Sequence, residues 1–341
     1  MEKLFFCFFL FSVPIIIKAS RDPFIGAPIS NASSTQKLEV EKILKNLNKL
    51  AVKSIQSPDG DIIDCVDVLK QPAFDHPKLK DHKIQMRPSS YPEGIIFEQS
   101  DESSESIPQL WQQNGTCPEG TVPIRRTREE DILRASSLQR FGKKNPKNIP
   151  MAPQVVGNAG HEYAIAYTKG DRYYGAQAHM NAWKPNVQQR DEFSISQLWV
   201  INIDDSNNLN TIEAGWTDKL NGDWWMQYGD KVMGYWPSSI FTHLSGSASL
   251  IEWGGEITNS ESNGQHTRTQ MGSGHFPSEG FGKASYFNNI KIVNGNNQIV
   301  PPRYIDPYID NSNCYSLQTG SSHNWGTFIY YGGPGRNPSC P

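Results

Sequence analysis

The sequence predicts an all-β protein: an antiparallel β-sandwich preceded by a region that contains a helix and long loops. From about residue 161 onward, short runs rich in Tyr, Trp, Phe, Val and Ile alternate with Gly, Asn, Asp and Pro, which is the pattern of strands joined by turns. No long segment with helical periodicity follows residue 150, and strands without intervening helices favour a sandwich or a barrel. The predicted strands are residues 162–168, 173–183, 195–203, 209–216, 224–228, 231–236, 248–257, 284–293 and 327–331.

The N-terminal part has a different texture. Apolar residues recur every three or four positions over residues 36–53, which predicts one amphipathic helix, and Ser33, Ser34 or Thr35 is placed to cap it. From Pro58 to about residue 153, prolines and charges are frequent. We therefore expect this part to be an adjunct with little core of its own.

The first residues predict a secretory signal peptide. A short charged start is followed by an apolar run over residues 4–17 and by the small residues Ala19 and Ser20, so cleavage is expected near Ala19. A membrane anchor is the weaker alternative, because the run falls short of the roughly 20 apolar residues that span a bilayer. We expect a secreted, extracellular protein that has no membrane association once residues 1–19 are removed.

The cysteine count predicts disulfides. Cys7 leaves with the signal peptide, so Cys65, Cys117, Cys314 and Cys340 remain. An even number in an oxidising compartment indicates two bridges, for which three connectivities exist. Pairing of neighbours, Cys65 with Cys117 and Cys314 with Cys340, keeps each bridge within its own half. The wide spacing does not fit a structural zinc site, and we expect neither a metal nor another cofactor.

The charge excludes one class of partner. The net charge is −3 and the isoelectric point is about 6.3, so the chain has no basic field of the kind that binds nucleic acid. Two sequons are present, at Asn31 and Asn114. Both are expected to be glycosylated and therefore to lie at the surface.

Two apolar and aromatic runs each contain carboxylates. Glu213 lies in Ile-Glu-Ala-Gly-Trp, and Glu252 and Glu256 lie in Glu-Trp-Gly-Gly-Glu. Burying an anionic carboxylate in such a strand is costly, and two neighbouring carboxylates separate in pKa, so that one stays protonated while the other is ionised. This arrangement suits acid/base catalysis, and we expect the chemistry here. His161-Glu162, by contrast, lacks the second histidine of the HExxH zinc motif.

Strand parity groups these glutamates with glycines. Glu252, Gly254 and Glu256 share one face of their strand, and Glu213 shares a face with Gly215 if residues 209–216 form one strand. Glycine beside a carboxylate lets a substrate backbone approach closely. Parity does not choose between Glu252 and Glu256. Composition alone favours a plainer interpretation, in which these glutamates are solvated on an edge strand.

Longer motifs resemble the neprosin family of secreted plant proteins, which is named for a prolyl endopeptidase. In the N-terminal half, the segments that resemble the activation peptide of this family are residues 64–67, 70–77 and 117–126. In the C-terminal half, the resemblance runs through residues 234–237, 252–256, 269–277, 279–286 and 331–335.

The resemblance implies a two-sheet antiparallel β-sandwich with a glutamic-peptidase dyad. Carried over by position, the catalytic residues are Glu213 and Glu256, and Glu252 is a supporting residue. It also implies an acid-activated zymogen that cleaves proteins or peptides after proline. Residues 20–152 are then an activation propeptide, an intramolecular inhibitor that covers the cleft until it is removed near residues 150–155. Residues 153–341 are the catalytic sandwich.

One departure from the family lies between Trp216 and Trp224. Only residues 217–223 separate them, where the family has a much longer segment with several strands and a further pair of cysteines. We expect the sandwich to lack internal strands, which would expose apolar faces and unpaired edges. A single clean gap indicates a skipped exon, a faulty gene model or an inactive splice form.

Two other functions remain open. One is a catalytically inactive secreted β-sandwich, associated with the cell wall, that binds glycan or protein through its aromatic residues. The other is a glycoside hydrolase, which also uses two carboxylates and aromatic platforms. Turnover of peptide or of polysaccharide at acid pH distinguishes the two enzymes.

Overall fold

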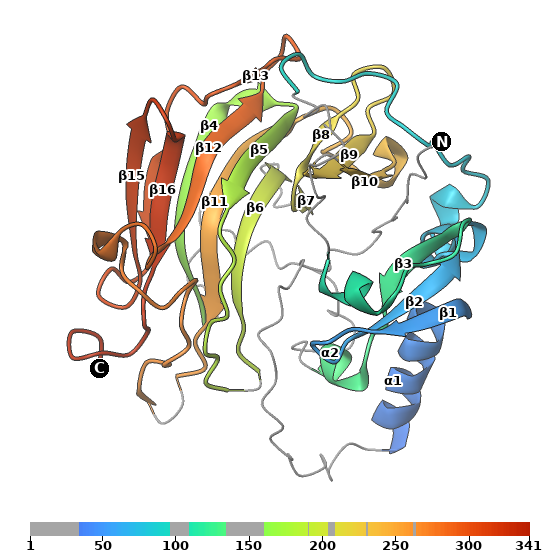
Figure 1. Ribbon diagram of the computed structural model, residues 1–341, viewed down its shortest axis with the longest axis horizontal. Helices are drawn as coiled ribbons and strands as arrows, with labels where there is room; N and C mark the ends of the chain where they lie inside the picture. Colours follow the sequence, from blue (N-terminus) through green and yellow to red (C-terminus); the bar gives the residue numbers. More distant parts are fainter. Residues whose placement is uncertain are drawn as a thin grey trace.

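The computed structural model describes residues 34–95, 109–133, 160–189, 191–203, 209–229, 231–261 and 264–341. Figure 1 shows a β-sandwich with a smaller N-terminal lobe beside it. The predicted signal peptide, residues 1–19, and the sequon asparagine Asn31 lie outside the described residues. In the part of the chain that is described, no helix is long and apolar enough to cross a membrane.

The sandwich consists of two antiparallel sheets. The larger sheet has the strand order β10-β9-β8-β5-β12-β16-β15, with β13 paired to β12, and the smaller has the order β14-β4-β11-β6-β7. The strands are β4 (His161–Tyr173), β5 (Gly175–Met180), β6 (Ser194–Ile203), β7 (Leu209–Ile212), β8 (Gly215–Thr217), β9 (Trp224–Tyr228), β10 (Lys231–Trp236), β11 (Ala248–Thr258), β12 (Ser285–Val293), β13 (Ile299–Val300), β14 (Asp306–Ile309), β15 (Ser316–Ser322) and β16 (Gly326–Gly332). The all-β expectation is confirmed.

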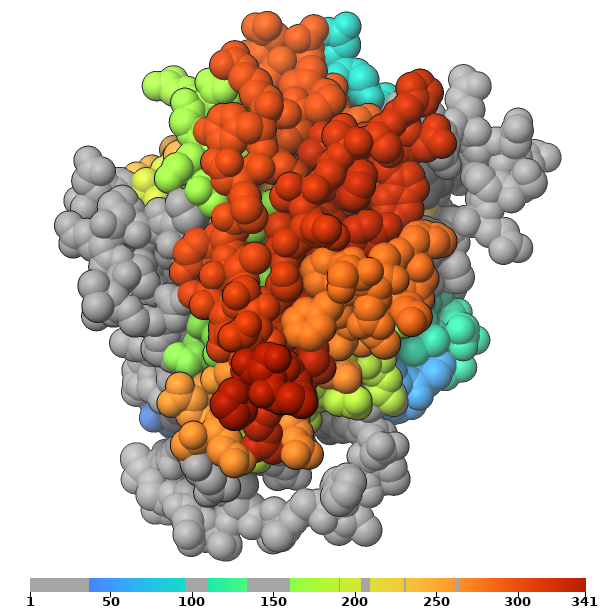
Figure 2. Space-filling view, turned by 90° about the vertical axis from the view of Figure 1, so that its left-hand side faces the viewer, coloured from blue at the N-terminus to red at the C-terminus, as the bar shows by residue number. Residues whose placement is uncertain are grey.

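The main core lies between the two sheets. Ile251, Trp253 and Ile257 of β11 belong to one buried cluster with Phe287 of β12 and Ile329 of β16. The three residues of β11 occupy alternate positions along the strand, as expected for a strand that buries one face against a facing sheet. Residues of the last quarter of the chain, coloured orange and red, cover most of the face shown in Figure 2.

One predicted strand is two strands in different sheets. The expected run 209–216 divides into β7, which pairs with β6, and β8, which pairs with β5 and β9. Gly215 has φ +134°, and a side chain there would overlap the carbonyl oxygen of Trp225. The bend at Glu213 and Ala214 therefore carries the chain from one sheet to the other, and the expected common face of Glu213 and Gly215 is wrong. The polar strands β14 and β15 lacked an apolar pattern and were not predicted.

The N-terminal lobe is a small three-stranded antiparallel sheet with two helices. Its order is β1-β2-β3, and its elements are α1 (Ser34–Leu47), β1 (Ala51–Gln56), β2 (Ile62–Asp67), β3 (Thr121–Arg125) and α2 (Glu129–Leu133). Short 3₁₀ helices lie at Val68–Lys70, Pro72–Asp75, Pro77–Leu79 and Leu110–Asn114. The expected helix over residues 36–53 is wrong in its last turn, because residues from Ala51 onward pair with β2 instead.

Both disulfides join neighbouring cysteines. Cys65 of β2 is bonded to Cys117, and Cys314 is bonded to Cys340, with 5.4 Å between the Cα atoms in each case. Of the three connectivities that the sequence allowed, the structure has the one that keeps each bridge within its own half of the chain.

The gap between Trp216 and Trp224 leaves a continuous sheet. Trp216 of β8 lies opposite Trp225 of β9, so β8 connects β5 to the β9–β10 hairpin. The apolar side chains here form a second buried cluster that includes Val66 and Val122 of the N-terminal lobe. The expected exposed apolar face is therefore wrong at this place, because the lobe covers it. The strand β10 does end the larger sheet.

Candidate active site

Glu252 and Glu256 lie on β11, the central strand of the smaller sheet. Neighbouring strands pair with β11 along most of its length on both sides, and the two side chains are 0% and 3% exposed. The alternative of solvated glutamates on an edge strand is therefore wrong. Both side chains point to the face that bears Tyr163, Trp199 and Leu250, away from the core between the sheets.

Glu256 is held by two side chains from the start of β4. The hydroxyl of Tyr163 donates to Oε1 of Glu256 at 2.7 Å, and Nδ1 of His161 lies 2.6 Å from the same oxygen. Burial raises the pKa of Tyr163 well above its ordinary value, and the adjacent charge of Glu256 and their hydrogen bond add to this effect. Tyr163 therefore stays protonated and remains a donor.

Glu252 lies on the same face of β11 as Glu256, four residues earlier in the chain, and Gly254 lies between them on that face. It lies directly opposite Tyr167 of β4 and Trp199 of β6. Gly254 has φ +149°, and a side chain there would overlap the carbonyl oxygen of Ala164 in β4. Glycine is thus required between the two glutamates because β4 approaches the backbone closely.

Glu213 follows directly after β7, in the bend that leads to β8, and is half-buried. Ile212, the last residue of β7, lies opposite Val200 of β6, and β6 pairs in turn with β11. Glu256 therefore lies on the central strand of the smaller sheet, and Glu213 directly follows the strand at the edge of that sheet.

A second carboxylate network closes the end of the sandwich near His161. Glu192 is buried and accepts hydrogen bonds from the backbone and hydroxyl of Ser260, at 3.1 and 2.6 Å, and from Thr267 at 2.7 Å. Thr269 also donates to it. Burial raises the pKa of Glu192, but these hydrogen bonds outweigh it and hold the pKa below its ordinary value. This ionised carboxylate has a structural environment, since it joins the loop that follows β11 to the turn before β6, where the backbone N–H of Gln189 also donates to it at 3.2 Å.

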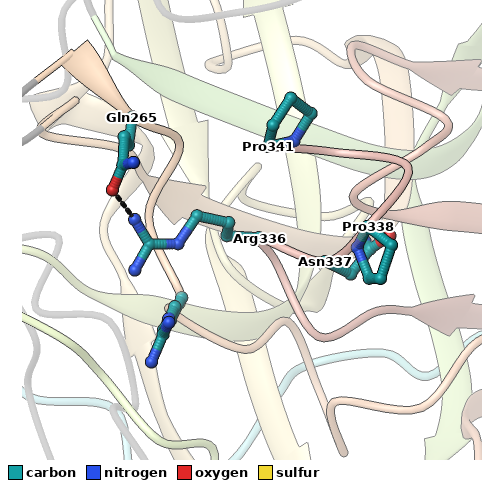
Figure 3. A pocket seen from close by; sticks show the side chains of 6 residues that line it. Gln265, Arg336, Asn337, Pro338 and Pro341 are labelled. Atoms are coloured by element: carbon teal, nitrogen blue, oxygen red, sulfur yellow. Dashed lines mark hydrogen bonds between the residues drawn. The ribbon is translucent and has the colours of Figure 1, made fainter.

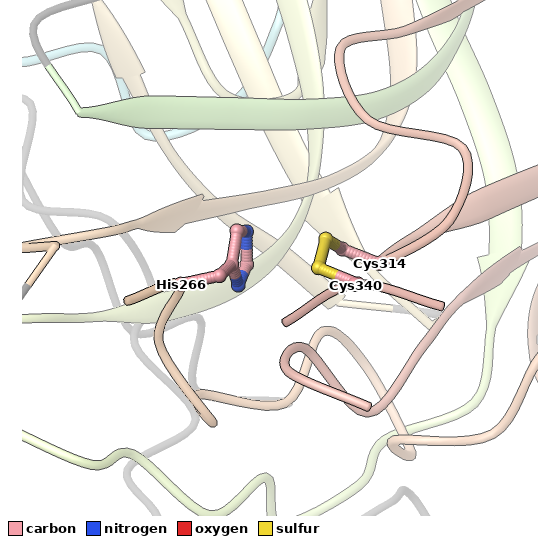
Figure 4. Close-up of side chains that lie close together, drawn as sticks. All are labelled: His266, Cys314 and Cys340. Atoms are coloured by element: carbon pink, nitrogen blue, oxygen red, sulfur yellow. A yellow bond between two sulfur atoms is a disulfide. The ribbon is translucent and has the colours of Figure 1, made fainter. Parts of the chain in front are cut away.

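His266, Cys314 and Cys340 lie close together, as in a metal site (Figure 4). The two sulfur atoms are bonded to each other, so neither is a thiolate ligand. Nε2 of His266 instead contacts both oxygens of Glu162, at 2.9 and 3.0 Å. This histidine is part of an ion pair.

A cavity of about 500 Å³ opens between the loop after β11 and the C-terminal segment (Figure 3). Its lining consists of Gln265, Arg268, Arg336, Asn337, Pro338 and Pro341. None of the three glutamates contributes to it. Its two arginine side chains could not serve as a general acid or base at acid pH.

Two residues of this site have no distinguishing signal in the sequence. There, His161 stands out only beside the incomplete HExxH motif, and Tyr163 only as part of a predicted strand. Their contact with Glu256 arises from the β4–β11 register, which places Tyr163 directly opposite Glu256. The glycosylation candidate Asn114 is exposed, and its side-chain amide donates to the carbonyl of Gln56 at 2.7 Å.

A sandwich of two antiparallel sheets that buries two glutamates on a central strand defines a β-sandwich protein with paired buried carboxylates. Residues 54–167 match the family described as neprosin activation peptide, and residues 216–334 match the family described as neprosin. The chain belongs to the neprosin family, a family of prolyl endopeptidases, and carries its activation peptide. The match to the second family begins just after Glu213.

Proposed function

We propose that this chain is the zymogen of a secreted, acid-active glutamic endopeptidase that cleaves peptide bonds after proline. Glu213 and Glu256 form its catalytic dyad, and residues 20–152 are the inhibitory propeptide. The observation that carries the proposal is the environment of Glu256, a buried carboxylate on a central strand that is hydrogen-bonded by Tyr163 at 2.7 Å. Such a group is poised for proton transfer.

The mechanism follows from two carboxylates in different protonation states. The ionised glutamate takes a proton from a water molecule, whose oxygen attacks the scissile carbonyl carbon. The protonated glutamate donates to the oxyanion that forms. When the carbon–nitrogen bond breaks, the proton that the base took from water passes to the leaving amine, and a hydroxyl of the intermediate returns a proton to the glutamate that acted as the acid, so the product is a carboxylic acid and both glutamates regain their starting states. The rate should fall toward neutral pH, where both carboxylates are ionised and no acid remains.

The two carboxylates of this scheme lie on the central strand of the smaller sheet, for Glu256, and directly after its edge strand β7, for Glu213. In the full-length chain Glu256 is 3% exposed, and its hydrogen-bond partners His161 and Tyr163 belong to β4. Removal of the residues that precede β4 is proposed to open the cleft.

The test is cleavage of a proline-containing peptide at acid pH by the processed protein. Glu213→Gln and Glu256→Gln should each reduce kcat by at least about 10²-fold, the lower range of a lost acid or base, and circular dichroism should show the same fold. Glu252→Gln is the matched control on the same strand and should retain most of the activity. Full activity of either dyad variant would rule out the dyad.

One observation favours the inactive, binding alternative. Five aromatic rings form a continuous cluster on β12, β16 and the adjoining loops, with 4.8 Å between the ring centroids of Tyr286 and Trp325. The other members are Phe281, Phe328 and Tyr330. Such rings stack on sugars as well as on one another. Retention of the protein on a cell-wall polysaccharide, lost in Trp325→Ala, together with no peptide cleavage would support this alternative.

A further inference from the structure

Two side chains converge on a single oxygen of Glu256. His161 begins β4, and Tyr163 follows two residues later on the same face. Nδ1 of His161 and the hydroxyl of Tyr163 lie 2.6 and 2.7 Å from Oε1. Both groups are placed by the β4–β11 pairing, in which Tyr163 lies opposite Glu256 and His161 lies opposite Thr258.

Both contacts favour the ionised form of Glu256. Tyr163 is buried and protonated, so its hydroxyl donates and Oε1 accepts. Nδ1 of His161 lies within hydrogen-bond distance of the same oxygen, and a carboxylate oxygen can only accept, so the ring donates to it from Nδ1. Hydrogen bonds to a carboxylate stabilise its charged form.

The other groups around this carboxylate act against a negative charge. Glu252 lies on the same strand, and Asp310 accepts a hydrogen bond from the backbone N–H of Tyr163 at 2.8 Å. The electrostatic influence of both carboxylates reaches Tyr163. From β6, the residue opposite Glu256 is the apolar Ile195. Among these groups, His161 is the one that can carry a positive charge.

We infer that His161 and Tyr163 are positioning residues that keep Glu256 ionised, so that Glu256 is the general base and Glu213 is the general acid. The inference rests on the proposed dyad and assigns its two roles. His161 packs edge-on against Phe193, with 5.5 Å between ring centroids, and its side chain is 19% exposed. The ring is therefore held in place and still reached by solvent protons.

The test is the pH profile of kcat/KM for the processed protein. Protonation of the base sets the acid limb of this profile. Tyr163→Phe removes one hydroxyl, and His161→Leu removes the imidazole that contacts the same oxygen of Glu256. Each variant should move the acid limb upward by about one pH unit, the scale of one lost charged-form contact. Tyr167→Phe, a hydroxyl removed from the same strand and face opposite Glu252, should leave the acid limb where it is.

A merely structural role predicts a different result. In that case Tyr163→Phe and His161→Leu would lower kcat or the unfolding temperature without moving the acid limb, and the inference would be wrong. An upward shift of the alkaline limb instead would assign the acid role to Glu256. Activity that persists in Glu256→Gln would refute the proposed dyad. Failure of the dyad can therefore be told apart from failure of the roles inferred for His161 and Tyr163.

A second measurement does not depend on activity. Carboxyl carbon resonances of ¹³C-glutamate in the full-length chain can be followed by NMR as pH falls, and the resonance of Glu256 is the one lost in Glu256→Gln. It should titrate at higher pH in Tyr163→Phe than in the unmodified chain. An unchanged titration in a folded variant would overturn the inference.

Discussion

The hydroxyl of Ser90 donates a hydrogen bond to the carboxylate of Asp218, with 2.5 Å between the two oxygens. The backbone N–H groups of Ser89 and Ser90 donate to the same carboxylate, at 2.5 and 3.2 Å. Asp218 is completely buried and lies in the loop that joins β8 to β9. This side chain therefore ties the activation-peptide region to the loop between β8 and β9.

Replacing Asp218 should loosen that attachment. Asp218→Asn places an NH₂ group against backbone donors, so at least one buried N–H loses its acceptor, at about 1–3 kcal/mol. We expect the urea midpoint of the full-length chain to fall accordingly and residues 78–95 to become more sensitive to trypsin. Ser90→Ala, which loses only the hydroxyl bond, is the graded control and should cost about 1 kcal/mol. Equal midpoints for Asp218→Asn and the unmodified chain would contradict this role.

Gly254 should be intolerant of a side chain. Gly254→Ala brings a methyl group into the carbonyl of Ala164 at φ +149°, which forces β4 and β11 apart at the center of the smaller sheet. A loss of more than about 3 kcal/mol or failure to fold is expected. Gly282→Ala provides the control, because its φ is +84° but nothing lies within 4 Å of the added carbon. Thermal unfolding of the two variants side by side measures the difference, and similar melting temperatures would refute the close approach.

Glu192 should contribute to stability above acid pH. Its pKa is lowered from an ordinary value of 4.5, so its contribution is fully present above that pH and is lost as the pH falls through the lower folded value. Glu192→Gln should lower stability at pH 7 by about 2 kcal/mol and weaken the decline seen on acidification. Urea unfolding at pH 7, 5 and 3 tests this. If the variant and the unmodified chain lose the same amount of stability between pH 7 and pH 3, Glu192 is not linked to acid unfolding.

The contribution of His266 to stability should have the opposite pH dependence to that of Glu192. Burial lowers its pKa, but the hydrogen bonds to Glu162 and to the carbonyl of Thr267 outweigh this and raise the pKa above 6.5. Its contribution is fully present below pH 6.5 and is lost as the pH rises through the folded value. His266→Gln should therefore destabilise the protein more at pH 5 than at pH 9 in calorimetric scans. The exposed pair of His275 and Glu279 supplies the control, because His275→Gln should change little at either pH.

The local sequence pattern was sufficient to predict β11, the strand that carries Glu252 and Glu256. The apolar and aromatic run over residues 248–257 predicted β11, and the structure extends it only to Thr258. The same reasoning failed for residues 209–216, since the bend at Glu213 is imposed by the change of sheet and has no signature of its own. It also failed for Ala51, which continues the helical pattern yet pairs with Val66 in a sheet.

The all-β class, the even set of cysteines and the short runs that hold Glu213, Glu252 and Glu256 can be found from composition and local pattern along the chain. The pairing of the cysteines, the covering of the β8–β9 apolar side chains by the N-terminal lobe, and the contacts of His161 and Tyr163 with Glu256 appear only in the folded molecule. Those contacts join residues far apart in the chain. They depend on strand order and register, which are set by the packing of the whole fold and which no local pattern encodes.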